Sequence, residues 1–69
     1  MRDHVAYVLV PSLRRIRLEQ ALSQEELAAR AGVARTTVLR AEAGYPIRPV
    51  SVRKLAAALR VRPIVLQQN

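Results

Sequence analysis

The sequence predicts an all-α fold of five short helices, preceded by a short strand or an apolar arm. Apolar residues recur at helical spacing in several segments, and capping residues, glycines or prolines stand where these segments begin and end. The stretch from Val5 to Val10 instead has the β-branched and aromatic composition of a strand. The 69 residues make one small domain. We expect residues 1–11 to form the arm and residues 12–69 the helical domain.

The clearest helix start is at Ser23. Glu26 follows three residues later, so the serine hydroxyl and the glutamate carboxylate are each expected to satisfy a backbone N–H of the first turn. The helix therefore begins at Gln24. Gly32 supplies the left-handed conformation at which it ends, after about two turns.

The next helix, from Arg35 to about Ala43, has two chemically distinct faces. At about 100° per residue, Val38 and Ala41 lie on one side, toward the preceding helix. Gly44 ends the helix. Arginine pairs bidentately with guanine, and apolar groups contact the thymine methyl. The two helices therefore predict a helix-turn-helix whose outward face offers four base-contacting side chains to a DNA groove: Arg35, Thr36, Leu39 and Arg40.

A first helix is predicted from Ser12 to about Ala21. Its inward stripe consists of Leu13, Ile16, Arg17 and Gln20. Burying a lone charge costs on the order of several kcal/mol, so an inward arginine needs a partner. Glu42 is the acid on the protein side of the 35–43 helix. We therefore predict a structural ion pair between Arg17 and Glu42, the alternative being two separate exposed charges.

The remainder of the chain predicts a loop and two more helices. The loop 45–50 contains two prolines, which favour an extended course. Ser51 is expected to cap a helix whose apolar stripe is Val52, Leu55, Ala56 and Leu59. Pro63 suits the first turn of a short fifth helix that carries Ile64, Val65 and Leu66.

The first eleven residues precede the helical pattern. Pro11 stops the apolar stretch from Val5 to Val10, and an isolated strand would leave its backbone groups unpaired. We expect the stretch either to pair with the same strand of a second subunit or to fold back as an extra helical turn. His4 has no cysteine or second histidine near it and is expected to be a solvated terminal side chain.

Charge and composition limit the classes of function that this chain can have. The net charge is +7 and the isoelectric point is about 11.6, and eleven of the twelve cations are arginine. Such a balance indicates an anionic partner, most often nucleic acid. The chain has no cysteine for a disulfide or a thiolate metal site. Its longest apolar run is far shorter than the ~20 residues that span a bilayer and lacks a signal-peptide cleavage site, so we expect a cytoplasmic protein.

Three sequence blocks resemble the Cro/repressor (XRE-like) type of helix-turn-helix regulator of phages and bacteria. They are LRRIR, then SQEELAARAGV, then TTVLRAEAG, and the spacing continues through Leu55, Leu59 and Val61. The resemblance covers about residues 11–69. It implies a five-helix, phage-repressor-like DNA-binding domain, an internal Arg17–Glu42 pair and a fifth helix at the dimer contact. Phosphate contacts are predicted for Gln24, Thr37 and Arg48, of which Gln24 also braces the second helix of the motif.

The sequence departs from this family in places that affect stability. Ala34 stands where a serine or threonine usually caps the 35–43 helix, Ala21 replaces a frequent glycine, and Arg62 replaces a polar cap before Pro63. The first eleven residues have no family counterpart.

These observations predict a sequence-specific DNA-binding transcriptional regulator, a repressor, that binds a partly palindromic operator as a homodimer. The alternative is an antitoxin or adaptor whose stretch from Val5 to Val10 docks a protein partner. An enzyme is not expected, because the five acids show no pairing with His4 or a nucleophile and the three serines stand at helix starts. No cofactor, metal or membrane partner is predicted.

Overall fold

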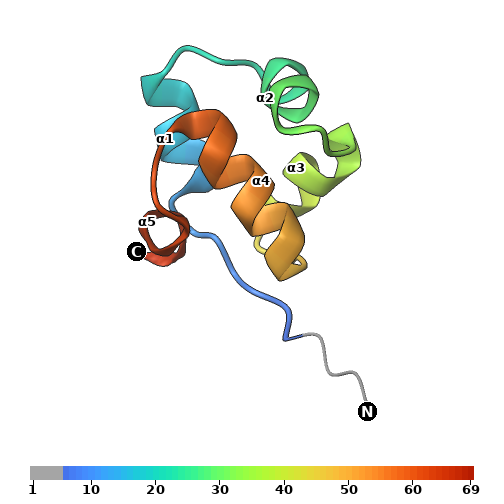
Figure 1. Ribbon diagram of the computed structural model, residues 1–69, viewed down its shortest axis with the longest axis vertical. Coiled ribbons are helices and arrows are strands. Elements are labelled where there is room, and N and C mark those ends of the chain that lie inside the picture. The colour runs from blue at the N-terminus through green and yellow to red at the C-terminus, as the bar shows by residue number, and fades with distance from the viewer. Residues whose placement is uncertain (1–5) are drawn as a thin grey trace.

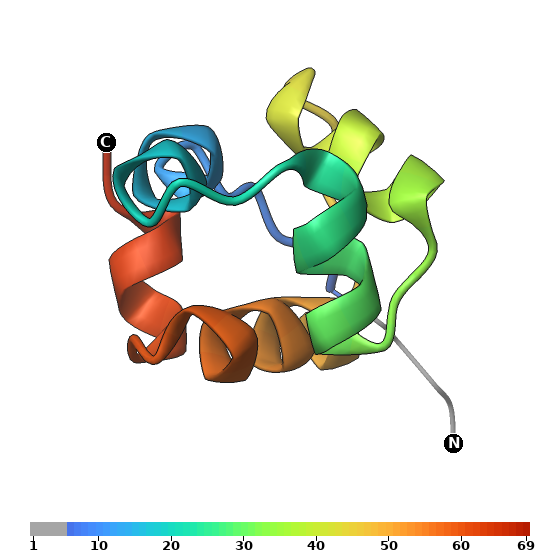
Figure 2. The ribbon, with the colours of Figure 1, turned by 90° about the horizontal axis from the view of Figure 1, so that it is seen from above.

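The computed structural model describes residues 6–69 and contains five helices in that range (Figure 1). They are α1 (Leu13–Glu19), α2 (Gln24–Ala31), α3 (Arg35–Glu42), α4 (Pro49–Leu59) and α5 (Pro63–Gln67). The predicted all-α fold is confirmed. Figure 2 shows the helices arranged around a common centre, with α4 along one side and α5 at the opposite end of the molecule from α3. None of these helices is long and apolar enough to cross a membrane.

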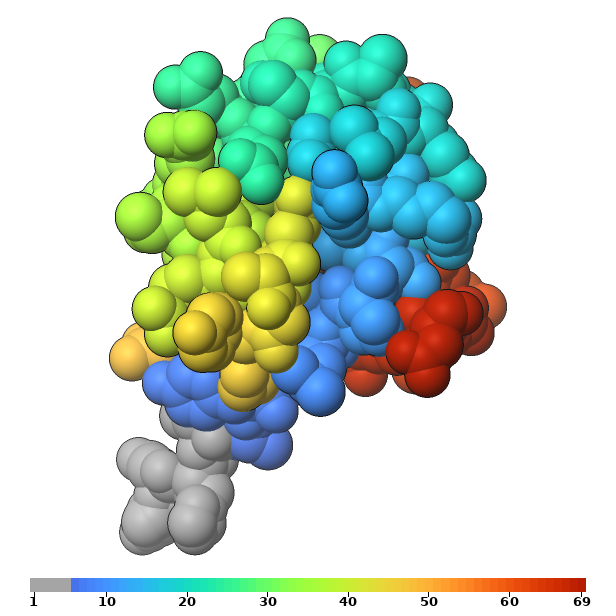
Figure 3. Space-filling model, turned by 180° about the vertical axis from the view of Figure 1, so that it is seen from behind, coloured from blue at the N-terminus to red at the C-terminus, as the bar shows by residue number. Residues whose placement is uncertain are grey.

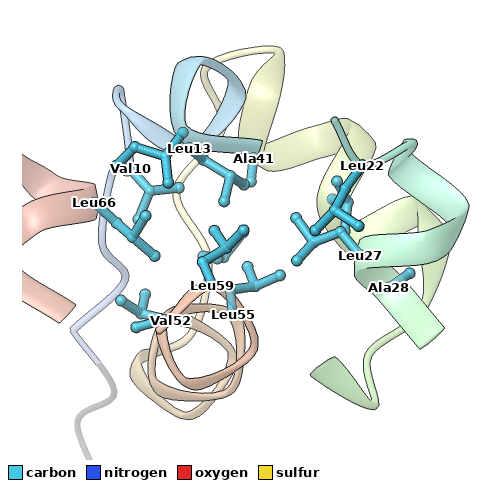
Figure 4. Close-up of a cluster of buried hydrophobic side chains, with 14 residues drawn as sticks. Val10, Leu13, Leu22, Leu27, Ala28, Ala41, Val52, Leu55, Leu59 and Leu66 are labelled. Atoms are coloured by element: carbon cyan, nitrogen blue, oxygen red, sulfur yellow. The ribbon is translucent and has the colours of Figure 1, made fainter. Parts of the chain in front are cut away.

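The apolar stripes that the sequence predicts meet in one core. Leu55 and Leu59 of α4 lie among residues from every other helix (Figure 4). The largest fully buried side chains are Leu13, Leu27, Leu55, Leu59, Leu66, Val38 and Val52. Because α4 packs against both α2 and α5, while α1 contacts α3 and α5, each helix is fixed by at least one other. The core thereby holds α2 and α3 in a defined relative orientation.

Four helix ends close in the same way, and two of them do so without glycine. Gly32 after α2 and Gly44 after α3 have φ angles of 71° and 97°. Ala21 and Arg60 adopt the same left-handed conformation after α1 and α4, with φ angles of 58° and 60°. In each case the next backbone N–H donates to a carbonyl five residues earlier, at 3.0–3.2 Å. A side chain with a Cβ is strained in this conformation, so Ala21 and Arg60 each cost stability.

Two of the serines that stand at predicted helix starts do not cap a helix. The Ser12 hydroxyl does not cap α1 but donates to the carbonyl oxygen of Gln68 near the C-terminus. Helix α4 does not begin after Ser51: it begins at Pro49, with Arg48 in the capping position and no side-chain cap. Proline suits the first helical position, since its φ is already helical and its missing N–H would have no partner there. Only Pro46 of the two loop prolines therefore lies outside a helix.

The N-terminal segment is tied to the loop after α3 of the same chain. Val8 forms an isolated antiparallel bridge with Ile47: the Val8 N–H donates to the Ile47 carbonyl at 2.7 Å, and the Ile47 N–H to the Val8 carbonyl at 2.8 Å. Val8 packs against the core, and Val10 belongs to it. The extra helical turn is therefore not formed, and the bridge partner of Val8 is not a second subunit. Val5 and His4 lie outside the described residues.

Candidate nucleic-acid interface

Helix α3 separates its side chains into a buried face and an open face. Val38 is fully buried and Ala41 is 4% exposed, and both belong to the core. Arg35, Thr36 and Arg40 are exposed, and Leu39 keeps 38% of its surface. The four predicted base-contacting side chains are thus all accessible from outside. They form a continuous outward face over the eight residues of the helix.

The orientation of α3 depends on a short turn after α2. The capping box predicted at the start of α2 is formed: the Glu26 N–H donates to the Ser23 hydroxyl at 2.9 Å, and the Ser23 N–H to the Glu26 carboxylate at 2.8 Å. At the C-terminal end of α2, Gly32 adopts the left-handed conformation and changes the direction of the chain. Ala34 then leads into α3 in an extended conformation. Ala34 provides no side-chain acceptor, so α3 begins without a side-chain cap.

A buried ion pair joins α1 to the end of α3. The Arg17 Nε donates to Glu42 Oε2 at 2.6 Å, and a second guanidinium nitrogen donates to Glu42 Oε1 at 2.9 Å. The two side chains are 8% and 5% exposed. A third guanidinium nitrogen donates to the Leu22 carbonyl at 2.7 Å. The guanidinium therefore has a partner on three sides, as a buried charge requires.

Glu42 stays ionised in this environment. Burial removes water and by itself raises the pKa of Glu42, but the hydrogen bonds from Arg17 and Gln24, together with the charges of Arg17 and Arg14, bring the pKa below its ordinary value. The same pairing raises the pKa of Arg17. Because both groups remain charged, the pair fixes the C-terminal end of α3 against α1.

Gln24 lies at the start of α2 and is turned toward α3. Its Nε2 donates to Glu42 Oε1 at 3.0 Å, and the side chain is half-buried. The amide thus connects the first residue of α2 to the last residue of α3. In this position Gln24 braces the two helices against each other, and its contact with a phosphate stays a prediction.

Three predicted DNA-contacting residues lie together beside the outward face of α3: Arg40, Thr37 and Arg48. They line a shallow hollow, which also includes Tyr7, Ser51, Pro46 and Ile47. Arg48 is exposed and directly precedes α4, whereas Thr37 is half-buried. The structure thus brings one predicted base contact next to two predicted phosphate contacts. Gln24 is not part of this hollow.

Tyr45 is a site residue that the sequence analysis did not identify. The Arg40 guanidinium lies over its ring, 4.7 Å from the ring centroid, and the Tyr45 N–H donates to the Arg40 carbonyl at 3.0 Å. Cation–π contacts of this kind restrict an exposed guanidinium. The available signal was an aromatic residue directly after the glycine that ends α3, five positions beyond Arg40. Tyr45 therefore orients a predicted base-contacting side chain.

Most acids of the described residues are already engaged away from this surface. Glu42 is paired with Arg17, Glu26 completes the capping box, and Glu19 accepts from Arg15 at 2.9 Å. None of the residues that line the hollow is acidic. No group of three potential metal ligands occurs within residues 6–69. The arrangement is suited to binding an anionic polymer.

Comparisons with known proteins agree with this geometry. A family model described as helix-turn-helix (HTH_3) matches residues 13–66. No curated protein matches the chain. Among solved structures, the restriction-modification controller protein C.AhdI from Aeromonas hydrophila is 40% identical, with a TM-score of 0.74, over 78% of this chain and 83% of that chain.

Two further structures are similar. A hypothetical transcription factor from Neisseria, NHTF, is 31% identical, with a TM-score of 0.78, over 99% of this chain and 86% of that chain. SinR, a master regulator for biofilm formation solved in complex with DNA, is 25% identical, with a TM-score of 0.77, over 87% of this chain and 100% of that chain. The chain belongs to the XRE-type (HTH_3) helix-turn-helix family of DNA-binding transcription regulators, which are typically not enzymes.

Proposed function

We propose that this protein is a sequence-specific transcriptional repressor that binds a partly palindromic operator as a homodimer. The observation that carries the proposal is the division of α3 into a buried face and an open face. An α-helix with its side chains is about 10–12 Å in diameter, and the major groove of B-DNA is about 12 Å wide. The open face of α3 therefore fits into the groove while the opposite face stays against the core.

Each exposed side chain of α3 has a chemically matched target in the groove. Arg35 and Arg40 are suited to guanine, whose O6 and N7 accept two parallel hydrogen bonds from a guanidinium. Leu39 is suited to a thymine methyl group, and the Thr36 hydroxyl donates to or accepts from either base of a pair. Tyr45 limits the positions open to Arg40, which supports selectivity at one base pair.

Phosphate contacts set the position of α3 on the duplex. We assign them to Gln24, Thr37 and Arg48. Each neutralised phosphate contributes about −0.9 to the slope of log affinity against log salt concentration. Arg48 is the charged member of this set, so Arg48→Ala should lower that slope by about one and weaken binding to all sequences alike.

The homodimer is assigned to the α5 side of the domain. Ile64 is an exposed apolar residue on a helix whose Leu66 is fully buried in the core. In the proposed dimer a second copy covers Ile64, and the two copies of α3 enter successive major grooves, with half-sites 34–36 Å apart. Ile64→Asp should then yield monomers in sedimentation velocity and weaken binding to a full operator more than binding to a half-site.

The experiment that tests this function selects duplexes from a random pool with the purified full-length protein. The expected result is a consensus with two inverted half-sites about one helical turn apart. Arg35→Ala and Arg40→Ala should each lower the affinity for that consensus by about 1–3 kcal/mol in gel shifts at fixed salt and relax the base preference. Arg15→Ala is the matched control, since Arg15 is an exposed arginine of α1 that lies outside α3 and does not line the hollow.

A pool without a consensus would contradict sequence-specific binding, and a single unrepeated half-site would contradict the dimer. The adaptor alternative receives no support from the segment that it requires. Val8 uses its N–H and C=O within the chain, and Val10 is buried in the core.

A further inference from the structure

The N-terminal segment is held next to the predicted DNA-contacting residues. The bridge between Val8 and Ile47 fixes the segment against the loop that joins α3 to α4. Figure 3 shows this contact as the blue segment beside the yellow one. Successive side chains of an extended chain point to opposite sides. Val8 packs on the core, so Tyr7, which is exposed, points away from it.

Tyr7 completes a hollow whose polar groups are all suited to an anion. The hollow brings together three hydroxyl-bearing side chains, Tyr7, Thr37 and Ser51, and the two guanidinium groups of Arg40 and Arg48. No carboxylate lines it. Hydroxyl and guanidinium groups are among the side-chain donors that proteins use for the phosphates of DNA. The hollow adjoins the outward face of α3 through Arg40, so a duplex against α3 would present its backbone there.

We propose that this hollow holds one phosphate of the DNA backbone and that the Tyr7 hydroxyl donates a hydrogen bond to it. The N-terminal segment is then part of the DNA-binding surface. This inference rests on the proposed function and adds a contact from a segment that lies outside the helix-turn-helix. The Val8–Ile47 bridge holds Tyr7 beside the hollow. The same bridge fixes the loop that carries Arg48.

The test compares Tyr7→Phe with the wild-type full chain on the selected operator. The variant lacks only the hydroxyl. Because Tyr7 is exposed, we expect the variant to fold as the wild type does, which a thermal melt verifies. We expect roughly a tenfold loss of affinity, because a hydrogen bond to a charged group is lost. The loss should be similar on operator and unrelated duplexes, since phosphates carry no base information. Leu9→Ala is the control, because Leu9 is an exposed residue of the same segment outside the hollow.

Duplexes in which single phosphates are replaced by neutral methylphosphonates identify the contact. At one methylphosphonate position per half-site, the affinity of the wild-type protein should fall to that of Tyr7→Phe on the unmodified duplex. The affinity of the variant should fall little further at the same position. Equal affinities of the variant and the wild type on every duplex would overturn the inference. The inference would also be overturned if the affinities of the variant and the wild type still differed at every methylphosphonate position. Failure of the proposed function is distinguishable, since it would appear as a wild-type protein that selects no consensus or an Arg40→Ala variant with unchanged base preference.

Discussion

Replacement of Glu42 by glutamine should destabilise the fold by about 3 kcal/mol. Glu42 accepts two hydrogen bonds from Arg17 and one from Gln24, and its side chain is 5% exposed. The amide retains one acceptor oxygen but turns an NH₂ donor toward the guanidinium. It therefore leaves the charge of Arg17 buried without a counter-ion. Breaking a buried pair in this way costs about 3–5 kcal/mol, and the retained acceptor places glutamine at the lower end.

This loss is large relative to the stability of so small a domain. At roughly 0.05–0.15 kcal/mol per residue, a chain of this length has a free energy of unfolding of about 3.5–10 kcal/mol. Glu42→Gln thus removes roughly 30% or more of this free energy. Because Glu42 is the last residue of α3, the same change should loosen the helix that carries the base-contacting side chains.

A double-mutant cycle measures the pair directly. The free energies of unfolding of Glu42→Gln, Arg17→Met and the double variant are obtained by urea denaturation followed by circular dichroism. We expect the sum of the stability losses of the two single variants to exceed the loss of the double variant by roughly 2 kcal/mol. Part of the stability loss of Arg17→Met remains in the double variant, since the Leu22 carbonyl loses its hydrogen-bond donor in both of these variants. A coupling energy below about 0.5 kcal/mol would refute the assignment of the pair as a structural link.

The pH dependence of stability gives an independent check of the same pair. The pKa of Glu42 is lowered in the folded protein, so its contribution is present above the ordinary glutamate pKa of about 4.3 and is lost as the pH falls through the folded value. The raised pKa of Arg17 lies far above this range and adds no variation there. The stability difference between wild type and Glu42→Gln should therefore shrink below pH 4. A difference that is constant from pH 7 to pH 3 would contradict this reasoning.

Four further substitutions have defined outcomes. Ala21→Gly should raise the free energy of unfolding by roughly 1 kcal/mol, because glycine adopts the φ of 58° without strain; an unchanged urea midpoint would contradict this. Ala34→Ser should supply the missing cap of α3 and add about 0.5–1 kcal/mol in the same assay, whereas Ser23→Ala should lose about as much from α2. Tyr45→Leu should leave stability nearly unchanged but reduce discrimination at the base pair that Arg40 contacts, and a selected consensus identical to that of the wild type would count against the stacking role.

The sequence by itself determined the helices whose signals are local. Ser23, Glu26 and Gly32 lie within ten residues of one another, and the hydrogen bonds that they form close the two ends of α2. Likewise, the two faces of α3 follow from helical periodicity alone, since Val38 and Ala41 recur at the spacing of a buried stripe. Local signals failed where two structures were compatible with the same residues. Ser51 has the chemistry of a cap, but Pro49 suits the first helical position, and the helix began there.

Only the tertiary structure decided which distant residues became neighbours. The segment around Val8 could pair with any free backbone, and Ile47, 39 positions later, was brought to it by the packing of α3 and α4. Tyr7 acquired Arg40 and Arg48 as neighbours through that bridge. Such contacts leave no periodic or capping pattern in the sequence, because they depend on the relative placement of whole elements, and that placement is fixed by the shared core.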